Sequence, residues 1–507
     1  MSAAGLRERE AEPTGRQIVC MGAKAPSWIG GSRLGHRLSR ALRVLPAERR
    51  HVLWLLLVLA LVKGLIWSIS LPPWYGPDEP AHFEYVQYLA TNHHVPATGD
   101  LPDWSKSFPY EIQCSTRNLG FRSNAEFFAE PPWGPDPGAC RQRHDGAARV
   151  PESPVSQAGD YSPFYYALAL PLWEAAGSAP VETRLHAVRL LSVLLGVVAT
   201  AFAYLAAVEI FGRRLWLAEA ATAVFALNPI ESQQTAIVSN DALLLALAAA
   251  TAWRLLAALK GPLRAGDAIW LGALIGAAFW AKPQGAFLVA GLPPVLLAAR
   301  LRGESWGAII RWTSLVALLS GALAAAEVGG GVLWRGRVAP HGLLHTPPGL
   351  HGLAQWLQIY SDRSFNHLYF LFVVSAWGDL SWFSATLPAP LLGGVLVAYG
   401  LALAGLLLLL IRSRRREAAL AAALFTATAV TGLILVLELL YFRSTGVQIL
   451  QGRSFLEVWP LVAPGLVAGL LALVPSRCQP PAAAVVILGA VALNAASVMV
   501  LWDTLYG

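Results

Sequence analysis

Two adjacent carboxylates, Asp78 and Glu79, stand directly after the first long apolar segment of the chain. Pro77 and Pro80 favour a turn followed by a helix start, and apolar residues then recur at helical spacing. The pattern predicts a short amphipathic helix at a membrane interface, with both acids at its N-terminal end. Such a pair can supply a general base and a supporting acid or metal ligand, because mutual repulsion raises one pKa. The alternative is that the acids only cap the helix.

Further polar residues stand at the ends of later apolar runs. Asn240 and Asp241 begin such a run, where they serve either as N-cap residues or as binding residues. Asp379 lies between Trp377 and Trp382, and aromatic faces beside a polar anchor suit a sugar ring. Tryptophan is also typical of membrane-interface belts, so a structural role for both indoles stays open.

Basic residues and cysteines complete the set of candidates. Arg453, Lys282 and Arg443, in that order, are candidates to bind an anionic group, or they can simply extend from helix ends toward the interface. Cys114 and Cys140 share one segment and are predicted to form a disulfide there. His341 and His345 have metal-like spacing, but such a pair is a weak signal outside an HExxH helix, so the sequence defines no metal site.

The elements that position these residues are membrane helices. Of the 507 residues, 55% are hydrophobic and 14% are charged, which excludes a soluble single-core protein. The net charge of +7 fits basic cytoplasmic loops and anionic lipid, so no nucleic-acid partner is predicted. The chain has no P-loop and no GxSxG elbow, which leaves nucleotide-driven pumping and serine hydrolysis without support.

We therefore predict an all-α polytopic membrane protein with about 11 transmembrane helices. Residues 1–50 are arginine-rich and predict a disordered cytoplasmic tail, and residues 51–507 form the membrane domain. Its large external loops are predicted at 72–183, with interfacial helices, and at 335–388. The predicted spans are 51–71, 184–211, 215–229, 241–259, 266–281, 284–300, 309–334, 389–411, 418–441, 455–474 and 482–502.

One apolar segment decides the orientation of every later span. Pro163 to Ala176 is short and contains Pro171, so it either crosses the membrane or lies along its surface. If it does not cross, nearly all short basic loops fall on the cytoplasmic side, as the positive-inside rule requires. We therefore predict an in-plane helix, a cytoplasmic N-terminus and an external C-terminus. This assignment places all the candidate residues on one external face.

The chain also resembles a known class of enzymes. PDEPAHF at 77–83 resembles the Asp-Glu motif in the first external loop of GT-C glycosyltransferases, which use lipid-linked sugars. More narrowly, the chain is similar to a family of predicted bacterial integral membrane proteins of unknown function that carries this motif. Further similar blocks are YSPFYY at 161–166, RLLSVLLG at 189–196, WGDLSW at 377–382 and QGRSF at 451–455. The last block departs from the family's VQGRYF pattern, with Ser454 in place of Tyr.

The resemblance implies an inverting sugar transfer at the external face of the bacterial plasma membrane. Asp78 would be the base, and Glu79 would orient the acceptor or a divalent cation such as Mg²⁺ or Mn²⁺. The implied partners are a polyprenyl-phosphate-linked sugar donor, a glycan or lipid acceptor of the cell envelope, and membrane lipids. The implied substrate-binding residues are His82, Asn240, Asp241, Lys282, Trp377, Asp379, Trp382 and Arg453.

Two other functions stay open. A transporter or flippase of lipid-linked saccharides would use the same lipid, although such proteins usually carry internal repeats, which we do not detect here. A non-catalytic membrane scaffold would keep the loop without its chemistry.

Overall fold

The computed structural model describes residues 47–96, 161–335, 368–381, 384–412, 418–445 and 450–506. The chain divides into two units, Met1–Val52 and Leu53–Gly507, and the fold below is that of the second. Most of the predicted tail, both cysteines of the predicted disulfide, the histidine pair and Trp382 lie outside the described residues, as does the side chain of Arg443.

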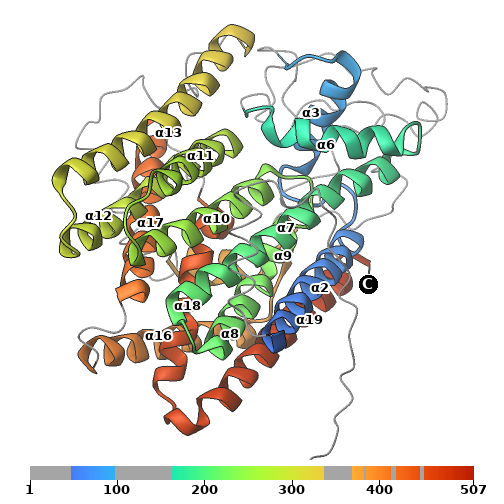
Figure 1. Cartoon of the computed structure of the whole chain (residues 1–507). Coiled ribbons are helices and arrows are strands. Elements are labelled where there is room, and N and C mark those ends of the chain that lie inside the picture. The colour runs from blue at the N-terminus through green and yellow to red at the C-terminus, as the bar shows by residue number, and fades with distance from the viewer. Residues whose placement is uncertain are drawn as a thin grey trace, which may run out of the picture. The chain divides into compact units, whose positions relative to one another are not determined.

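Helices make up nearly all of the described chain (Figure 1). The only strands described are the short antiparallel pair β1 (Asp379–Leu380) and β2 (Ala385–Thr386). The α-helices are α2 (Ala47–Ser70), α3 (Glu79–Asn92), α6 (Phe164–Ala176), α7 (Val181–Phe211), α8 (Leu215–Ala226), α9 (Pro229–Gln234), α10 (Asn240–Lys260), α11 (Ala265–Ala281), α12 (Leu292–Leu301), α13 (Trp306–Arg335), α16 (Ala389–Arg412), α17 (Ala418–Thr445), α18 (Trp459–Ala472) and α19 (Gln479–Tyr506). Shorter helical segments are η3 (Pro283–Gly291), η4 (Phe370–Gly378), η5 (Gly452–Val458) and η6 (Ser476–Cys478).

The helices confirm the predicted polytopic architecture. In the described chain, nine helical segments are long and apolar enough to cross a membrane, and α8 and α11 are shorter apolar helices. Together these elements match the predicted spans one for one. Large exposed apolar side chains such as Trp54, Leu318 and Met499 lie on α2, α13 and α19, where lipid would cover them. The protein is therefore a multi-pass integral membrane protein.

The segment at 164–176 forms helix α6, and its orientation in the plane of the membrane stays a prediction. Near the start of α7, the guanidinium of Arg189 donates to the carbonyl oxygens of Ser68 and Leu71 at the end of α2. The chain thus leaves α2 and enters α7 at the same end of the bundle, and α6 lies there too (Figure 1). The hydroxyl of Tyr506 donates to the carbonyl of Ser70, so α19 ends at this end as well.

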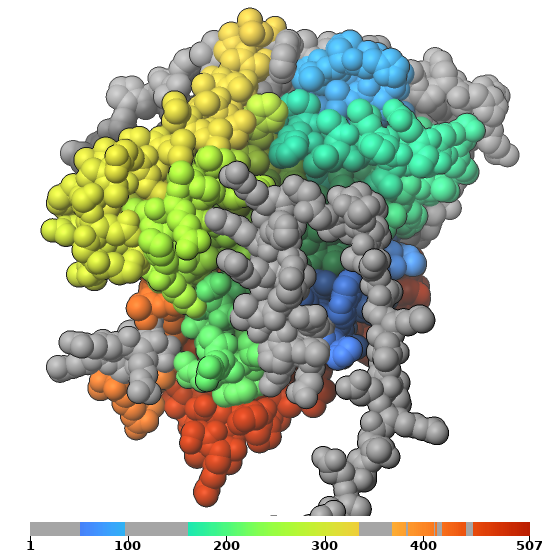
Figure 2. All heavy atoms as spheres, viewed as in Figure 1, coloured from blue at the N-terminus to red at the C-terminus, as the bar shows by residue number. Residues whose placement is uncertain are grey.

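Helices α3 and α6 form an aromatic layer over that end of the bundle. The rings of Tyr85 and Tyr166 stack with centroids 3.8 Å apart, and Phe83 packs against Trp173 at 5.1 Å. In the space-filling view α3 (light blue) and α6 (teal) lie against each other at the top (Figure 2). Burial of these rings fixes the start of α3, where Asp78 lies.

Helices α10 and α18 lie in the interior of the bundle, and their termini carry the candidate residues. Small residues allow close packing around them: a Cβ on Gly405 of α16 would stand 1.8 Å from the backbone oxygen of Gly469 in α18. Helix α11 also packs closely against its neighbour, since a Cβ on Gly272 would meet the backbone of Val316 in α13 at 2.8 Å. This close packing fixes the positions of the helix ends relative to one another.

Candidate functional site

Asp78 forms an ion pair with a residue from the far end of the sequence. Its Oδ2 accepts a hydrogen bond of 2.7 Å from the guanidinium of Arg453 in η5. Asp78 occupies the N-cap position of α3 but makes no side-chain capping hydrogen bond, and its backbone is left-handed, with φ of 60°. Aspartate and asparagine tolerate this conformation better than most residues. The side chain of Asp78 is thus turned to Arg453 and does not cap the helix.

A second ion pair lies beside the first. The ammonium of Lys282, between α11 and η3, lies 2.5 Å from Oδ1 of Asp241. The N-cap of α10 is Ser239, which accepts from the backbone N–H of Asp241, so neither Asn240 nor Asp241 serves as the N-cap residue. The amide of Asn240 donates to the carbonyl of Ala281 at 2.9 Å and joins the start of α10 to the end of α11.

These two pairs form what we name the four-charge cluster: Asp78, Arg453, Asp241 and Lys282. Each carboxylate also lies within electrostatic range of the other pair's cation. The cluster brings together residues from the start of α3, the start of α10, the turn before η3, and η5. Its formal charge is zero, because each acid is matched by one base.

His82 faces this cluster from α3. Its Nδ1 lies 2.7 Å from the hydroxyl of Tyr166, and its ring stacks between Tyr161 and Tyr166 at centroid distances of 5.7 and 5.9 Å. Burial lowers the pKa of His82 to about 4, although the nearby carboxylates Asp78 and Asp241 oppose the shift. The imidazole is therefore neutral at pH 7 and can accept or donate a hydrogen bond in the site.

The pKa values of Asp78 and Lys282 keep these two side chains charged. Burial, the largest influence, would raise the pKa of Asp78, but Arg453, His82 and Lys282 together hold it below its usual value. Burial and Arg453 would likewise lower the pKa of Lys282, yet Asp241 and Tyr161 together raise it above its usual value. An ionised carboxylate and two cations are thus available at pH 7.

The neutral state of His82 has a consequence for stability. The unfolded chain binds a proton at this residue below pH 6.5 and the folded chain only below about 4, so the free energy of unfolding should fall as pH drops through this window. The loss should approach roughly 3 kcal/mol. Thermal unfolding in detergent at pH 7.5, 5.5 and 4.5 measures it, with His82→Asn as the variant that cannot titrate. Parallel pH profiles for the two proteins would contradict the expectation.

Glu79 is placed apart from the cluster. Both its carboxylate oxygens accept hydrogen bonds from the guanidinium of Arg189, at 2.7 and 2.6 Å, and Oε1 also accepts from the N–H of Val238. Neither charged side chain has any exposed surface. This placement differs from the expectation that Glu79 orients the acceptor: its carboxylate ties the start of α3 to α7 and to the segment before α10.

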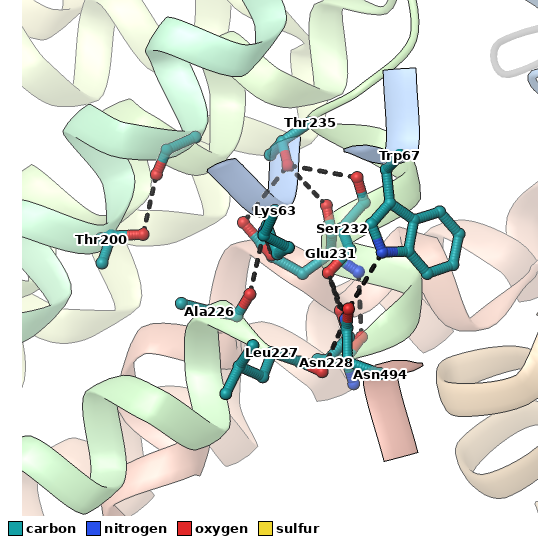
Figure 3. A network of polar contacts seen from close by, with 11 residues as sticks. Lys63, Trp67, Thr200, Ala226, Leu227, Asn228, Glu231, Ser232, Thr235 and Asn494 are labelled. Atoms are coloured by element: carbon teal, nitrogen blue, oxygen red, sulfur yellow. Dashed lines mark hydrogen bonds and ion pairs between the residues drawn. The ribbon is translucent and has the colours of Figure 1, made fainter. Parts of the chain in front are cut away.

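Beneath the site, a buried polar network fixes the short helix α9 (Figure 3). The ammonium of Lys63 in α2 lies 2.5 Å from the carboxylate of Glu231 in α9, and it also donates to the carbonyl of Ala226. Asn494 of α19 donates to Ser232 in α9 and accepts from the indole of Trp67. An intramembrane lysine is costly unless paired, and Glu231 is the partner of Lys63. These contacts fix the position of α9 relative to α2 and α19.

Asp379 lies next to the cluster, in a small pocket. Burial raises the pKa of Asp379 to about 7, and a side-chain hydrogen bond with Thr386 opposes the shift. Trp377 is buried, with 7% of its surface exposed, whereas a platform for sugar stacking would be more exposed. Its indole N–H donates to the hydroxyl of Tyr399 at 2.6 Å, and its ring packs against Trp459. The pocket is lined by Pro77, Ile230, Gln233, Gln234, Ser375, Asp379, Gln451 and Arg453.

Gly452 sets the position of Arg453. Its N–H donates to the hydroxyl of Ser375 at 2.7 Å, and a Cβ at this residue would stand 2.2 Å from the backbone nitrogen of Ala376. Gly452→Ala should therefore displace η5 and weaken binding of an anion to Arg453 by about tenfold, the equivalent of about one hydrogen bond. Binding of a lipid phosphate to purified protein measures it. Gly432→Ala is the matched control, because a Cβ there meets no atom within 4 Å.

The described residues do not form a divalent-cation site. In the described ranges no group of three or more His, Cys, Asp and Glu side chains lies close enough to hold a metal ion. Both acids of the four-charge cluster, Asp78 and Asp241, are already matched by basic side chains. No step is therefore derived through Mg²⁺ or Mn²⁺.

Several residues in or near the site were not assigned a role from the sequence. Arg189 and Tyr166 stand inside blocks that carry the resemblance, but no role was assigned to them. Buried Glu457 lies within electrostatic range of Lys282 and Asp241, and its acidic character in an apolar run was the available signal. Gln233 and Gln234 gave no signal, because a polar stretch between apolar runs is typical of any loop.

Comparison with known proteins gives a family and several distant structural likenesses. ArnT of Cupriavidus metallidurans, solved with undecaprenyl phosphate, is 14% identical, with 90% of this chain and 78% of that chain covered and a TM-score of 0.48. The oligosaccharyltransferase AglB of Archaeoglobus fulgidus, solved with an inhibitory peptide and a dolichol-phosphate, is 14% identical, with 90% and 56% covered and a TM-score of 0.46. The S. cerevisiae O-mannosyltransferase Pmt1-Pmt2 complex, bound to the sugar donor, is 14% identical, with 56% and 33% covered and a TM-score of 0.36.

The chain thus spans a third of the length of the mannosyltransferase chain and just over half that of the oligosaccharyltransferase. No curated protein matches it by sequence. The family model described as predicted membrane protein (DUF2142) matches residues 61–462, which is most of the chain and includes every residue of the four-charge cluster. The chain belongs to this family of predicted membrane proteins.

Proposed function

We propose that the protein is a membrane glycosyltransferase that moves a sugar from a polyprenyl-phosphate-type donor to a cell-envelope acceptor at the external face of a bacterial plasma membrane. The observation that carries the proposal is the four-charge cluster at one end of the bundle. Two cations there can bind a phosphate, and a carboxylate stands 2.7 Å from one of them. A lipid-anchored phosphate reaches the protein only near the membrane interface, which is where the helix ends lie.

The paired state of the cluster suggests how a donor would engage it. The phosphate of the donor is a diester whose single negative charge is shared by two oxygens, so it can accept charge-assisted hydrogen bonds from Arg453 and Lys282 together and replace Asp78 and Asp241 as their partner. Charge-assisted hydrogen bonds would then run from both cations to the phosphate oxygens. Asp78, released from Arg453, would then be free to accept a proton.

The transfer itself follows from that arrangement. The acceptor hydroxyl gives its proton to Asp78 while its oxygen attacks the anomeric carbon of the sugar. The bond from that carbon to the phosphate oxygen breaks, and its electron pair leaves on the phosphate, where Arg453 and Lys282 stabilise the added charge. Attack opposite the leaving group inverts the anomeric configuration. Neutral His82, beside Asp78 and Asp241, can orient the acceptor hydroxyl.

Transfer by the purified chain in lipid nanodiscs tests the proposal. The substrates are undecaprenyl phosphate carrying a radiolabelled sugar and membrane lipids or envelope glycans from a bacterial strain that lacks the protein. The expected result is a labelled acceptor together with an equal amount of free undecaprenyl phosphate. Movement of intact labelled donor between the leaflets of sealed vesicles, without any labelled acceptor, would instead identify a flippase.

A further inference from the structure

The pocket beside the four-charge cluster is small and polar on one side. Gln234, Ser375 and Asp379 line it, together with Arg453, and Pro77 closes it next to Asp78. Its free space corresponds to about one water-sized group. A single hydroxyl fits this space, whereas a whole sugar ring does not.

Gln234 is the unusual member of this lining. Its side chain is almost fully buried, with 1% of its surface exposed, yet neither its amide nitrogen nor its amide oxygen has a hydrogen-bond partner among the described residues. The neighbouring Gln233 is satisfied, since its amide oxygen accepts from the N–H of Ser381 at 2.8 Å. A buried amide without partners has lost its hydrogen bonds to water, and a bound group with both a donor and an acceptor would restore them.

The fold holds this amide in place. Gln234 is the last residue of α9, and Lys63 and Asn494 fix that helix through Glu231 and Ser232 (Figure 3). A polar group carried on a fixed buried helix is preorganised for its ligand and loses little freedom on binding. The position of Gln234 is thus set by helices α2 and α19, far from it in sequence.

We propose that the side chain of Gln234, with the carboxyl of Asp379, binds one hydroxyl group of the donor sugar. The inference rests on the proposed function and adds a specificity-determining residue to it. A hydroxyl is both donor and acceptor, which matches the two halves of an amide. Arg453 lines the same pocket, and the sugar is bonded directly to the phosphate that Arg453 would bind. The donor sugar, not the acceptor, is therefore the group that reaches Gln234.

Lipid binding to the full chain in nanodiscs tests this inference. The probes are undecaprenyl phosphate alone and undecaprenyl phosphate bearing glucose, galactose, mannose or arabinose. The variants are Gln234→Leu, of similar size, and Gln234→Asn, which keeps the amide but draws it back by one methylene. Gln479→Leu is the matched control, because the amide of this glutamine donates to the carbonyls of Leu471 and Val474 at the opposite end of the bundle.

We expect wild-type protein and the control to bind one glycosylated lipid about tenfold more tightly than undecaprenyl phosphate alone, the equivalent of about one hydrogen bond. Both Gln234 variants should lose this preference and bind the bare lipid with unchanged affinity, which shows that they are folded. A variant that keeps the full preference, or a wild type that prefers no glycosylated lipid, would overturn the inference and leave the phosphate site standing. Failure of the wild type to bind even the bare lipid would overturn the proposed function, and the inference with it.

Discussion

Asp78→Asn should lower the turnover number for sugar transfer by about 10²- to 10⁴-fold, the range expected for loss of a general base. The amide cannot take the acceptor proton, but it has the size of the carboxylate and tolerates the left-handed backbone found at this residue, with φ of 60°. The fold should therefore survive. Because the amide no longer competes for Arg453, the affinity for the donor should be unchanged or higher.

This separation of turnover from affinity distinguishes a base from a binding residue. Steady-state transfer in nanodiscs gives the turnover number, and direct titration with undecaprenyl phosphate gives the affinity. Asp503→Asn is the matched control, since this exposed aspartate of α19 makes the same change of charge elsewhere. If Asp78→Asn keeps more than a tenth of the wild-type turnover, Asp78 is not the base.

Arg453 gives the complementary result in the same experiment. Arg453→Gln removes the cation and leaves Asp78 without its partner, so binding of undecaprenyl phosphate should weaken, unlike in Asp78→Asn. Opposite effects on lipid affinity from the two members of one ion pair would support an exchange of partners. Equal losses would point to an ion pair that only holds the fold.

The architecture could be predicted from the sequence because each span is a local property. An apolar run near 20 residues, ended by charged or proline-containing loops, is sufficient to predict a crossing helix. The in-plane orientation of Phe164–Ala176 is a prediction of a different kind, because it rests on the distribution of arginines over all the loops together. The contacts of this helix with α3 and α7 now account for its placement.

The sequence identified individual candidate residues of the site, but it did not show which of them lie together in space. Asp78 and Arg453 are separated by 375 positions, and nothing in their spacing indicates which helix ends meet. Glu79 shows the same limit at short range. Sequence placed two acids side by side at a helix start, but the backbone turn at Asp78 directs its side chain to Arg453, while that of Glu79 reaches Arg189 inside the bundle. The two side chains therefore differ in burial: that of Asp78 is partly exposed beside Arg453, whereas that of Glu79 has no exposed surface.

Loss of Arg189 should have the largest effect on stability. Its guanidinium makes five hydrogen bonds, to both oxygens of Glu79 and to the carbonyls of Ser68, Leu71 and Pro72, with no exposed surface. Arg189→Met leaves the charge of Glu79 buried without a partner, which should cost about 3–5 kcal/mol. We expect a large fall in the thermal midpoint in detergent and in the yield of folded protein. Arg477→Met, which removes an exposed arginine near α19, is the control and should change neither.

A second substitution separates the unpaired charge from the lost packing. In Arg189→Met combined with Glu79→Leu neither charge of this buried pair remains, so the double variant should be more stable than Arg189→Met alone. Recovery should be partial, because the N–H of Val238 loses its acceptor and three carbonyls lose their donor. If the double variant also recovers measurable sugar transfer, Glu79 acts by positioning the start of α3. A stable double variant without any transfer, beside an active Asp503→Asn, would return Glu79 to the group of residues that act on substrate.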